Sequence, residues 1–592
     1  MSSGMPCHVG SRRLVFNLLV ASASPSLCHP RSSLRALYCS CSSFITAPTR
    51  WLPRRALSMM VHSRNDLFDY TSGRWLINDA LRHAERRRVF NIDGLRRLAA
   101  QSVDRSPDDI FDFAKLAEGG FNRTFLITMR DGFQMVARIP YPATVPKYFA
   151  VASEVATMTL LRSSGLPIPK VYGYSPTLDN AAESEYIFME FVRGTKLSDV
   201  WADLEEREIN SVLRQLTHLE SKMMSITFPA GGSLYYAQDL EKVAGGPPGV
   251  PVEDERFCVG PDTRLPLWFG RRSQLDVDRG PYDSAETALV KGAHKELSYL
   301  QQYGQPLLPF QRMRRAAYRY QEQQPSAHIE NLHRYLLIAP SLVPRDPTLA
   351  QFCIRHPDLQ PSNIIVSRTP DSKWQIVGLI DWQHASILPV SLLAGIPQRL
   401  QNYDDPISQL MTPLSLPENL EDLDNAEPSR AKELYHRRLV HYHYVKNTEE
   451  CNKLHHAALN EPAGTLRRRL FDHASEPWEG ETLALKVALI EAAENWQTLT
   501  GDDAPCPVVF DAEDVRETMK LDEVQRGKDE ILEAFNNMFG LGPEGWVPTD
   551  HYEEVVARSR QIKEDGMAAA ESEEERTEIA THWPFDDMDV TD

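Results

Sequence analysis

The most constraining feature of this sequence is an Asp that lies five residues before an Asn, with a second Asp at the end of the next apolar stretch. These residues are Asp358, Asn363 and Asp381. Residues 364–366 and 375–380 are rich in β-branched side chains, and a turn-forming Thr-Pro-Asp-Ser-Lys sequence lies between them. We therefore expect a β-hairpin that brings Asn363 and Asp381 to the same end.

This spacing suits phosphoryl transfer, a reaction in which the protein mainly positions the reactants and neutralises charge. One carboxylate must face the acceptor hydroxyl, and Asp358 is the candidate for accepting or orienting its proton. Further oxygens must hold Mg²⁺, and Asn363 and Asp381 are the candidates because Mg²⁺ prefers oxygen ligands. His356 is expected to hold the loop through a side-chain hydrogen bond.

The sequence His356-Pro357-Asp358, together with Asn363 and Asp381-Trp382-Gln383, resembles the catalytic loop and metal-binding segment of the aminoglycoside phosphotransferase family. This family lies within the protein-kinase-like superfamily, whose protein kinases carry His-Arg-Asp and Asp-Phe-Gly at these places. The resemblance implies an α+β, two-lobed protein-kinase-like fold with a small β-rich nucleotide lobe and a larger helical lobe. It also implies ATP and Mg²⁺ as cofactors and a small molecule as the phosphate acceptor.

Upstream, residues 113–139 show the pattern strand, glycine turn, strand, hairpin and strand that covers the phosphates of a nucleotide in kinase-like folds. Gly119 and Gly120 permit close approach of the backbone to phosphate, and Asn122 could add a side-chain donor. Arg138 stands where the resembled family usually has Lys. An Arg is planar and bidentate, so it could bind phosphate oxygens or pair with a carboxylate, but it changes the geometry that a Lys would give the site.

The expected partner of Arg138 is Glu154, which lies in a predicted helix over residues 147–162. Glu154 is at the edge of the apolar stripe of this helix, and a carboxylate in that position needs a cation. We therefore expect an ion pair between the two side chains. In the resembled family the next strand is the hinge, where backbone groups of Glu190 and Val192 would contact adenine.

The first sixty residues contain seven Arg, many Ser and no Lys, Asp or Glu. This composition is typical of a mitochondrial transit peptide, which the mitochondrial import machinery would recognise. A secretory signal is the alternative, because Arg12-Arg13 precede an apolar run. Basic residues continue long after that run, so we favour the mitochondrion.

The chain as a whole is acidic, with a net charge of −18. Such a charge repels phosphate backbones, which argues against a nucleic-acid partner. No apolar run reaches the roughly 18 residues that a membrane-spanning helix needs, so no transmembrane segment is expected.

Two segments outside the predicted catalytic loop carry expectations of their own. The Gly- and Pro-rich residues 230–282 could wall the acceptor pocket, with Arg271 meeting an anionic acceptor, or form a simple surface excursion. The acidic end, residues 572–592, is expected to be solvated or frayed. The predicted organisation of the whole chain has five parts. They are a transit peptide (1–60), a largely helical segment (61–105), the small nucleotide lobe (106–193), the large lobe with the catalytic loop, metal site and acceptor pocket (194–550), and an acidic tail (551–592).

From residue 68 onwards the chain also resembles fungal mitochondrial phosphotransferase-like proteins of the altered inheritance of mitochondria type. That group is named for a phenotype, and the resemblance supplies no substrate. It is carried by residues 68–75, 137–140, 232–236 and 356–358.

Two functional hypotheses follow from these features. The first is an ATP- and Mg²⁺-dependent kinase of a small-molecule hydroxyl or amine. The second is a nucleotide-binding or catalytically inactive kinase-like scaffold that acts in mitochondrial maintenance or inheritance. Asp358, Asn363 and Asp381 favour the first hypothesis, and Arg138 in place of Lys favours the second.

Overall fold

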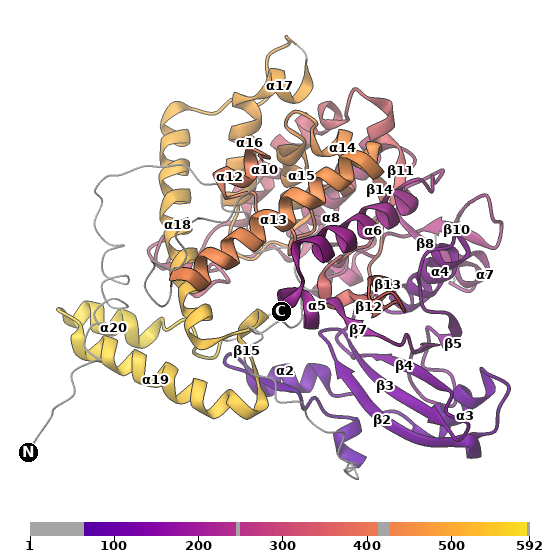
Figure 1. Ribbon diagram of the computed structural model, residues 1–592. Helices are drawn as coiled ribbons and strands as arrows, with labels where there is room; N and C mark the ends of the chain where they lie inside the picture. Colours follow the sequence, from indigo (N-terminus) through magenta and orange to yellow (C-terminus); the bar gives the residue numbers. More distant parts are fainter. Residues whose placement is uncertain (1–63, 244–248, 413–426, 502, 589–592) are drawn as a thin grey trace, which may run out of the picture.

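The computed structural model describes residues 64–243, 249–412, 427–501 and 503–588, so the predicted leader lies outside the described residues. A small lobe with a five-stranded sheet lies at the bottom of Figure 1, and a larger, mainly helical lobe lies above it. This is the predicted α+β, two-lobed fold. Within the described part of the chain, no helix is long and apolar enough to span a membrane.

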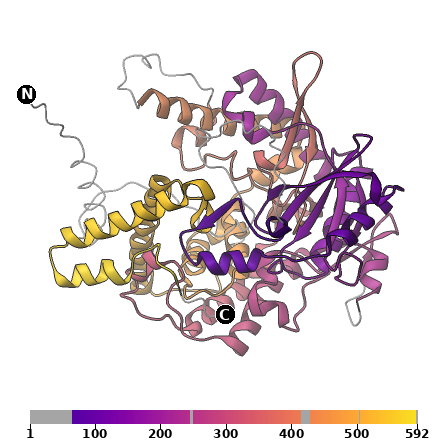
Figure 2. The same cartoon turned by 90° about the horizontal axis from the view of Figure 1, so that it is seen from below.

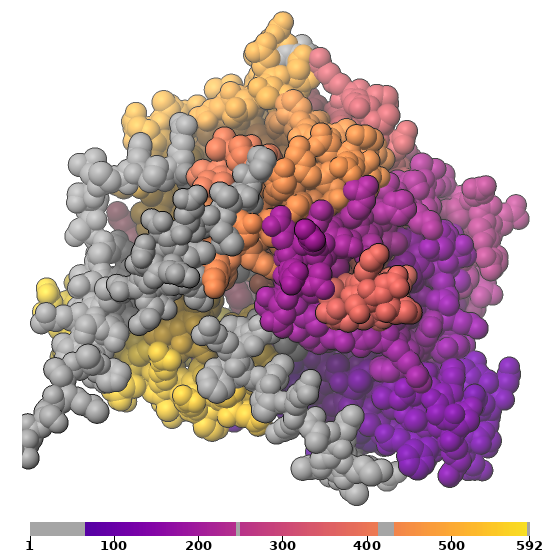
Figure 3. Space-filling view, in the orientation of Figure 1, coloured from indigo at the N-terminus to yellow at the C-terminus, as the bar shows by residue number. Residues whose placement is uncertain are grey.

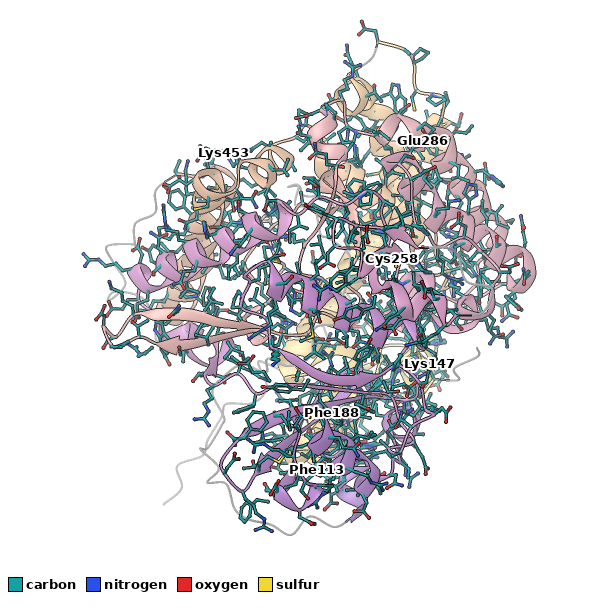
Figure 4. All side chains as sticks on the ribbon, turned by 90° about the vertical axis from the view of Figure 1, so that its right-hand side faces the viewer. Phe113, Lys147, Phe188, Cys258, Glu286 and Lys453 are labelled. Carbon is teal, nitrogen blue, oxygen red and sulfur yellow. The ribbon has the colours of Figure 1, made fainter. Side chains whose placement is uncertain are left out.

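The small lobe is built on an antiparallel sheet with the strand order β2-β3-β4-β6-β5. Side chains of β3 alternate between buried and half-buried, and one face of the sheet shares a core with α3. Figure 4 shows Phe113 and Phe188 in this lobe, below Cys258, Glu286 and Lys453 of the upper part. The elements are α3 (Ile92–Gln101), β2 (Ile110–Glu118), β3 (Asn122–Met129), β4 (Gln134–Pro140), α4 (Phe149–Ser163), β5 (Val171–Ser175) and β6 (Tyr186–Glu190).

Helix α4 lies between the two lobes and corresponds to the helix predicted over residues 147–162. Its residues from Ala150 to Met158 are all buried, because they pack against both the sheet and the large lobe. Val151, Val155 and Met158 join the core of the large lobe, whereas Ala152 packs with Tyr235 and Cys258. The predicted strands around residues 113–139 are also confirmed.

The large lobe encloses one extensive core to which most of its helices contribute. The predicted hairpin is present as β12 and β13, and it lies on the surface in Figure 3 as a salmon patch bordered by purple segments. The strands of the large lobe are β7 (Thr195–Lys196), β11 (Phe352–Ile354), β12 (Ile364–Arg368), β13 (Trp374–Leu379) and β14 (Ile387–Pro389). Its helices are α5 (Leu197–Val200), α6 (Glu206–Met224), α8 (Ala285–Tyr303), α9 (Arg312–Arg315), α10 (Pro325–Ile338), α11 (Val390–Leu393), α12 (Pro406–Gln409), α13 (Glu427–Cys451), α14 (Lys453–Leu459), α15 (Gly464–Ser475), α16 (Leu483–Glu494), α17 (Trp496–Thr500) and α18 (Ala512–Phe539).

The segment 230–282 is not the plain loop that its Gly and Pro content suggests. It contains a three-stranded sheet in the order β8-β10-β9, from which β8 contacts helix α4. Gly232 has a φ of +140° and donates its N–H to Ile387 O (2.9 Å), which ties the sheet to the chain that follows Asp381. The elements are β8 (Ser233–Tyr236), α7 (Ala237–Glu241), β9 (Val250–Pro251) and β10 (Phe257–Gly260).

The two ends of the described chain pack together, as Figure 2 shows beside the yellow helices. The short strand β1 pairs antiparallel with β15, so the start of the small lobe is joined to residues near the C-terminus. Trp583 and Phe585 are buried against Phe535 and Phe539, so the expectation of a solvated acidic end is wrong for these aromatic residues. The elements are β1 (Gly73–Trp75), α2 (Asp79–Arg86), β15 (Trp546–Pro548), α19 (Tyr552–Ala569) and α20 (Glu573–Thr581).

Candidate active site

The hairpin places two of the predicted site residues side by side. In the antiparallel register Ile364 lies opposite Leu379, so the residue before β12 and the residues after β13 share one end. The backbone N–H of Ile380 donates to Asn363 O (3.0 Å). Asn363 and Asp381 therefore lie where the spacing predicts.

Asp358 lies next to this end of the hairpin and is half-buried. Its Oδ2 accepts hydrogen bonds from Gln360 Nε2 (2.5 Å) and from Asn363 Nδ2 (3.0 Å). Burial and, next, the negative charge of Asp381 raise the pKa of Asp358 to about 7. A fixed carboxylate that titrates near neutral pH is suited to accepting a proton from a hydroxyl.

His356 holds the predicted catalytic loop in place. Its Nε2 lies 2.9 Å from Ile380 O, and its Nδ1 lies 3.1 Å from the backbone nitrogen of Asp358. A carbonyl only accepts and an N–H only donates, so Nε2 carries the proton and Nδ1 accepts. Burial lowers the pKa of His356 to about 4, which keeps the ring neutral. These contacts give His356 the structural role that was expected.

A buried network fixes the residue that begins the loop. Arg355 donates to Glu220 Oε1 through Nε (2.7 Å) and to Leu393 O through Nη1 (3.0 Å). The hydroxyl of Tyr444 donates to the other oxygen of Glu220 (2.7 Å) and accepts from Arg355 Nη2 (3.1 Å). The loop is therefore anchored to helices α6 and α13 as well as to the hairpin.

The donor atoms at Asn363 and Asp381 suit Mg²⁺. The Asn363 amide nitrogen also donates to Asp358 O (2.9 Å), which leaves its oxygen available as a ligand. Among the described residues there is no group of three or more His, Cys, Asp or Glu side chains that could hold a metal ion. Mg²⁺ is often bound by one or two protein ligands together with phosphate oxygens and water. The residues present therefore fit an ion that arrives with a nucleotide.

Arg138 connects the small lobe to this site. Its Nη1 forms an ion pair with Glu154, so the predicted pair is confirmed, and its Nη2 lies 2.5 Å from Asp381 Oδ1. Nη2 also lies 3.2 Å from the side-chain amide of Gln383. Although burial acts to raise it, the Arg138 charge holds the pKa of Asp381 below its usual value.

The glycine turn brings Asn122 to the same place. Gly119 and Gly120 lie between β2 and β3, and Gly119 N–H donates to Asn122 O (2.9 Å). With its amide oxygen turned towards the guanidinium, Asn122 accepts from Arg138 Nη2 (2.7 Å) and Nε (3.1 Å). The same oxygen lies 2.6 Å from the side-chain amide of Gln383, whose nitrogen donates to it when that amide is turned as well. Binding of phosphate by this turn stays a prediction.

Glu118, the residue before the glycine turn, has a role that the sequence reasoning missed. Its side chain is fully buried and accepts from the backbone N–H groups of Thr71 (2.9 Å) and Ser72 (2.8 Å). It also pairs with Lys115 Nζ (2.9 Å) and Arg123 Nε (3.0 Å). Residues 71 and 72, within the segment 68–75 that carries the family resemblance, therefore anchor the start of the glycine turn. The sequence feature that could have indicated this role is the acidic residue directly before Gly119 and Gly120.

The hinge residues lie where the large and small lobes meet. Glu190 ends β6, its N–H donates to Lys170 O (2.8 Å), and its carboxylate pairs with Arg162 (3.2 Å). Val192 packs closely on Gly378 of β13, where an added Cβ would lie 2.9 Å from Val192 Cγ1. The contact of Glu190 and Val192 with adenine stays a prediction.

The segment 230–282 contacts the chain after Asp381. His384 Nδ1 lies 3.0 Å from Thr263 O, and the Ser386 hydroxyl donates to buried Asp262 (2.6 Å). Arg271 is exposed, and its guanidinium lies 5.6 Å from the centroid of the Tyr303 ring on α8. The structure thus places this segment against the chain that follows Asp381, and its part in an acceptor pocket stays a prediction.

Comparisons with known proteins show the family to which the chain belongs. The model of the phosphotransferase enzyme family matches residues 112–250 and 267–391. A subtelomeric hrmA-associated cluster protein of Aspergillus fumigatus is 30% identical over 517 residues, which are 81% of this chain and 97% of that protein. The mitochondrial "altered inheritance of mitochondria protein 9" of Clavispora lusitaniae is 23% identical and covers 85% of this chain and 89% of its own length.

Among solved structures, a putative fructosamine-3-kinase of Thermobifida fusca aligns with 72% of this chain and 99% of its own, at 14% identity and a TM-score of 0.32. A TM-score this low does not establish a common fold, which is instead identified from the sheet order and the family match. The named mitochondrial relatives agree with the location predicted from the leader. The chain belongs to the phosphotransferase enzyme family, that of the aminoglycoside phosphotransferases.

Proposed function

We propose that this protein is an ATP- and Mg²⁺-dependent phosphotransferase that acts on a hydroxyl or amine of a small molecule in mitochondria. The observation that carries the proposal is the position of Asp358, which is bound by Gln360 and Asn363 beside Asp381. Membership of the family supports phosphoryl transfer. The Arg-rich leader and the relatives named as mitochondrial support the location.

In this proposal the two lobes share the work. Asp358 receives the proton of the acceptor group while the acceptor atom forms a bond to the γ-phosphorus and the bond to the β-γ bridging oxygen breaks, which releases ADP. Asn363 and Asp381 would hold Mg²⁺, which neutralises phosphate charge when bound. Gly119, Gly120, Asn122 and Arg138 would face the phosphates, and Glu190 and Val192 would contact adenine.

The test is phosphate transfer from Mg·ATP into a metabolite extract of mitochondria, followed by mass spectrometry for products that gain one phosphate. Asp358→Asn should lower the rate about 10²–10⁴-fold, the usual share of a general base. Asp371→Asn is the matched control, because Asp371 is exposed in the turn at the other end of the hairpin. Equal rates in wild type and Asp358→Asn would contradict the assignment.

One observation supports a second candidate function, a kinase-like scaffold without turnover. Arg138, which replaces the usual Lys, is engaged with Glu154 and Asp381 rather than left free for phosphate. A scaffold would bind nucleotide and yield no phosphorylated product. The same extract experiment separates the two, because binding of ATP without any new product in wild type would favour the scaffold.

A further inference from the structure

Arg138 is held on several sides by acceptors from different parts of the chain. Nη1 faces Glu154 on α4, and Nη2 faces Asp381 (2.5 Å) and Gln383 (3.2 Å) after β13. The Asn122 amide lies against Nη2 (2.7 Å) and Nε (3.1 Å). The guanidinium is therefore fixed by groups of the glycine turn, of α4 and of the metal-binding segment at once.

This cation is also buried, with Arg138 only 7% exposed and Glu154 3% exposed. If Arg138 moved away from Asp381 towards a bound nucleotide, it would give up its contacts with Asp381 and Gln383. A lysine has one nitrogen and could not serve Glu154 and Asp381 through separate groups, whereas a guanidinium can. The replacement of Lys by Arg thus creates a fixed positive charge at one oxygen of Asp381.

Protein kinases usually hold two Mg²⁺ ions with the Asp of the metal segment and the Asn of the catalytic loop. For both ions to be held, the oxygens of that Asp must be accessible. Here Asp381 Oδ1 is occupied by Arg138. What remains is the second oxygen of Asp381 and the amide oxygen of Asn363, whose nitrogen is turned to Asp358.

We propose that the Arg138 guanidinium takes the place of one of the two metal ions, so that Asp381 and Asn363 bind a single Mg²⁺ with the nucleotide. The inference rests on the proposed nucleotide-dependent function and specifies its metal requirement. It also gives a reason for Arg at a place where Lys is usual.

The experiment counts metal ions directly, with Mn²⁺ as the probe and adenylyl imidodiphosphate as the nucleotide. Electron paramagnetic resonance of free Mn²⁺ gives the number of ions bound per protein–nucleotide complex. Wild type should bind one ion. Arg138→Lys should bind two, because an ammonium that remains with Glu154 leaves both oxygens of Asp381 accessible.

A second variant provides the same test if Arg138→Lys does not fold. The double variant Arg138→Gln, Glu154→Gln removes a buried cation together with its partner, so no uncompensated charge is left at Glu154, and it should also bind two ions. Arg105→Gln is the matched control, because Arg105 pairs with exposed Asp131 at the far end of β3 and should leave the count at one. Thermal melting of each variant verifies that it is folded.

The outcomes separate this inference from the proposed function. Two ions in wild type, or one ion in every folded Arg138 variant, would overturn the single-ion inference and leave the proposed function standing. If wild type binds no Mn²⁺ in the presence of the nucleotide, the proposed function itself fails.

Discussion

The acceptor side and the phosphate side of the candidate site are built in different ways. On the acceptor side, Asp358 is held by His356, Gln360 and Asn363, all within five residues of it. The direct support of Asp358 is therefore local, although Arg355 at the start of the loop is anchored to Glu220 and Tyr444. The geometry around Asp358 itself follows mainly from the spacing of its neighbours.

On the phosphate side the supporting contacts come from far away in the chain. Glu118, before the glycine turn, is bound by Thr71 and Ser72, 47 and 46 residues away. Arg138 is bound by Asp381, 243 residues away. The position of the glycine turn thus depends on the correct assembly of both lobes and of the N-terminal segment. The comparison suggests that the two sides should respond differently to substitution.

The largest expected effect is on the phosphate side. Glu118→Ala would leave Lys115 and Arg123 buried without their carboxylate, and breaking a buried ion pair in this way costs about 3–5 kcal/mol. Chemical denaturation should show that loss in the free energy of unfolding. Asp131→Ala, which removes an exposed ion pair of the same lobe, is the control and should change stability little. Equal losses of stability in the two variants would contradict the importance of the buried Glu118 ion pairs.

A smaller effect is expected on the acceptor side. Tyr444→Phe removes one hydroxyl that contacts both Glu220 and Arg355. The buried Glu220 oxygen then loses its donor, and leaving a buried polar group unpaired costs about 1–3 kcal/mol. Because His356 still holds the loop locally, phosphate transfer by the folded variant should stay close to the wild-type rate. A loss of transfer as large as that of Asp358→Asn would show that the loop is not locally supported.

The smallest effect concerns pH. His356 is neutral in the folded protein, with a pKa of about 4 against 6.5 for the ordinary group. Its contribution to stability is complete above pH 6.5 and is lost as the pH falls from 6.5 towards 4, because the unfolded chain binds the proton first. At pH 5.5 this amounts to about 1 kcal/mol. Wild type should therefore lose about that much more stability than His356→Gln between pH 7 and 5.5, as measured by denaturation at each pH. Parallel curves would contradict the role of the neutral ring.

Much of the fold could be predicted from the sequence, because its patterns are local. The strands of residues 113–139, the α4 helix and the hairpin each follow from periodicity and turn residues, and all are present. The pairing of Arg138 with Glu154 could be predicted as well, since it needs only one strand and one helix to meet.

The remainder depends on contacts that no local pattern contains. The bond between Arg138 and Asp381 and the contact of Arg138 with Gln383 arise only when the two lobes close on each other. The burial of Trp583 and Phe585 was hidden by the acidic residues around them. The strands within residues 230–282 were obscured by the many Gly and Pro residues in the sequence of this segment.

The central claim, that Asp381 takes part in binding Mg·ATP, is tested most directly by thermal unfolding with and without the ligand. A ligand at one hundred times its dissociation constant stabilises the folded state by about 2.7 kcal/mol. We expect wild type to show a shift of that size with ATP and Mg²⁺ together, and Asp381→Asn to show a much smaller one. If Mg·ATP leaves the unfolding of wild type unchanged, or shifts both proteins equally, the claim is wrong.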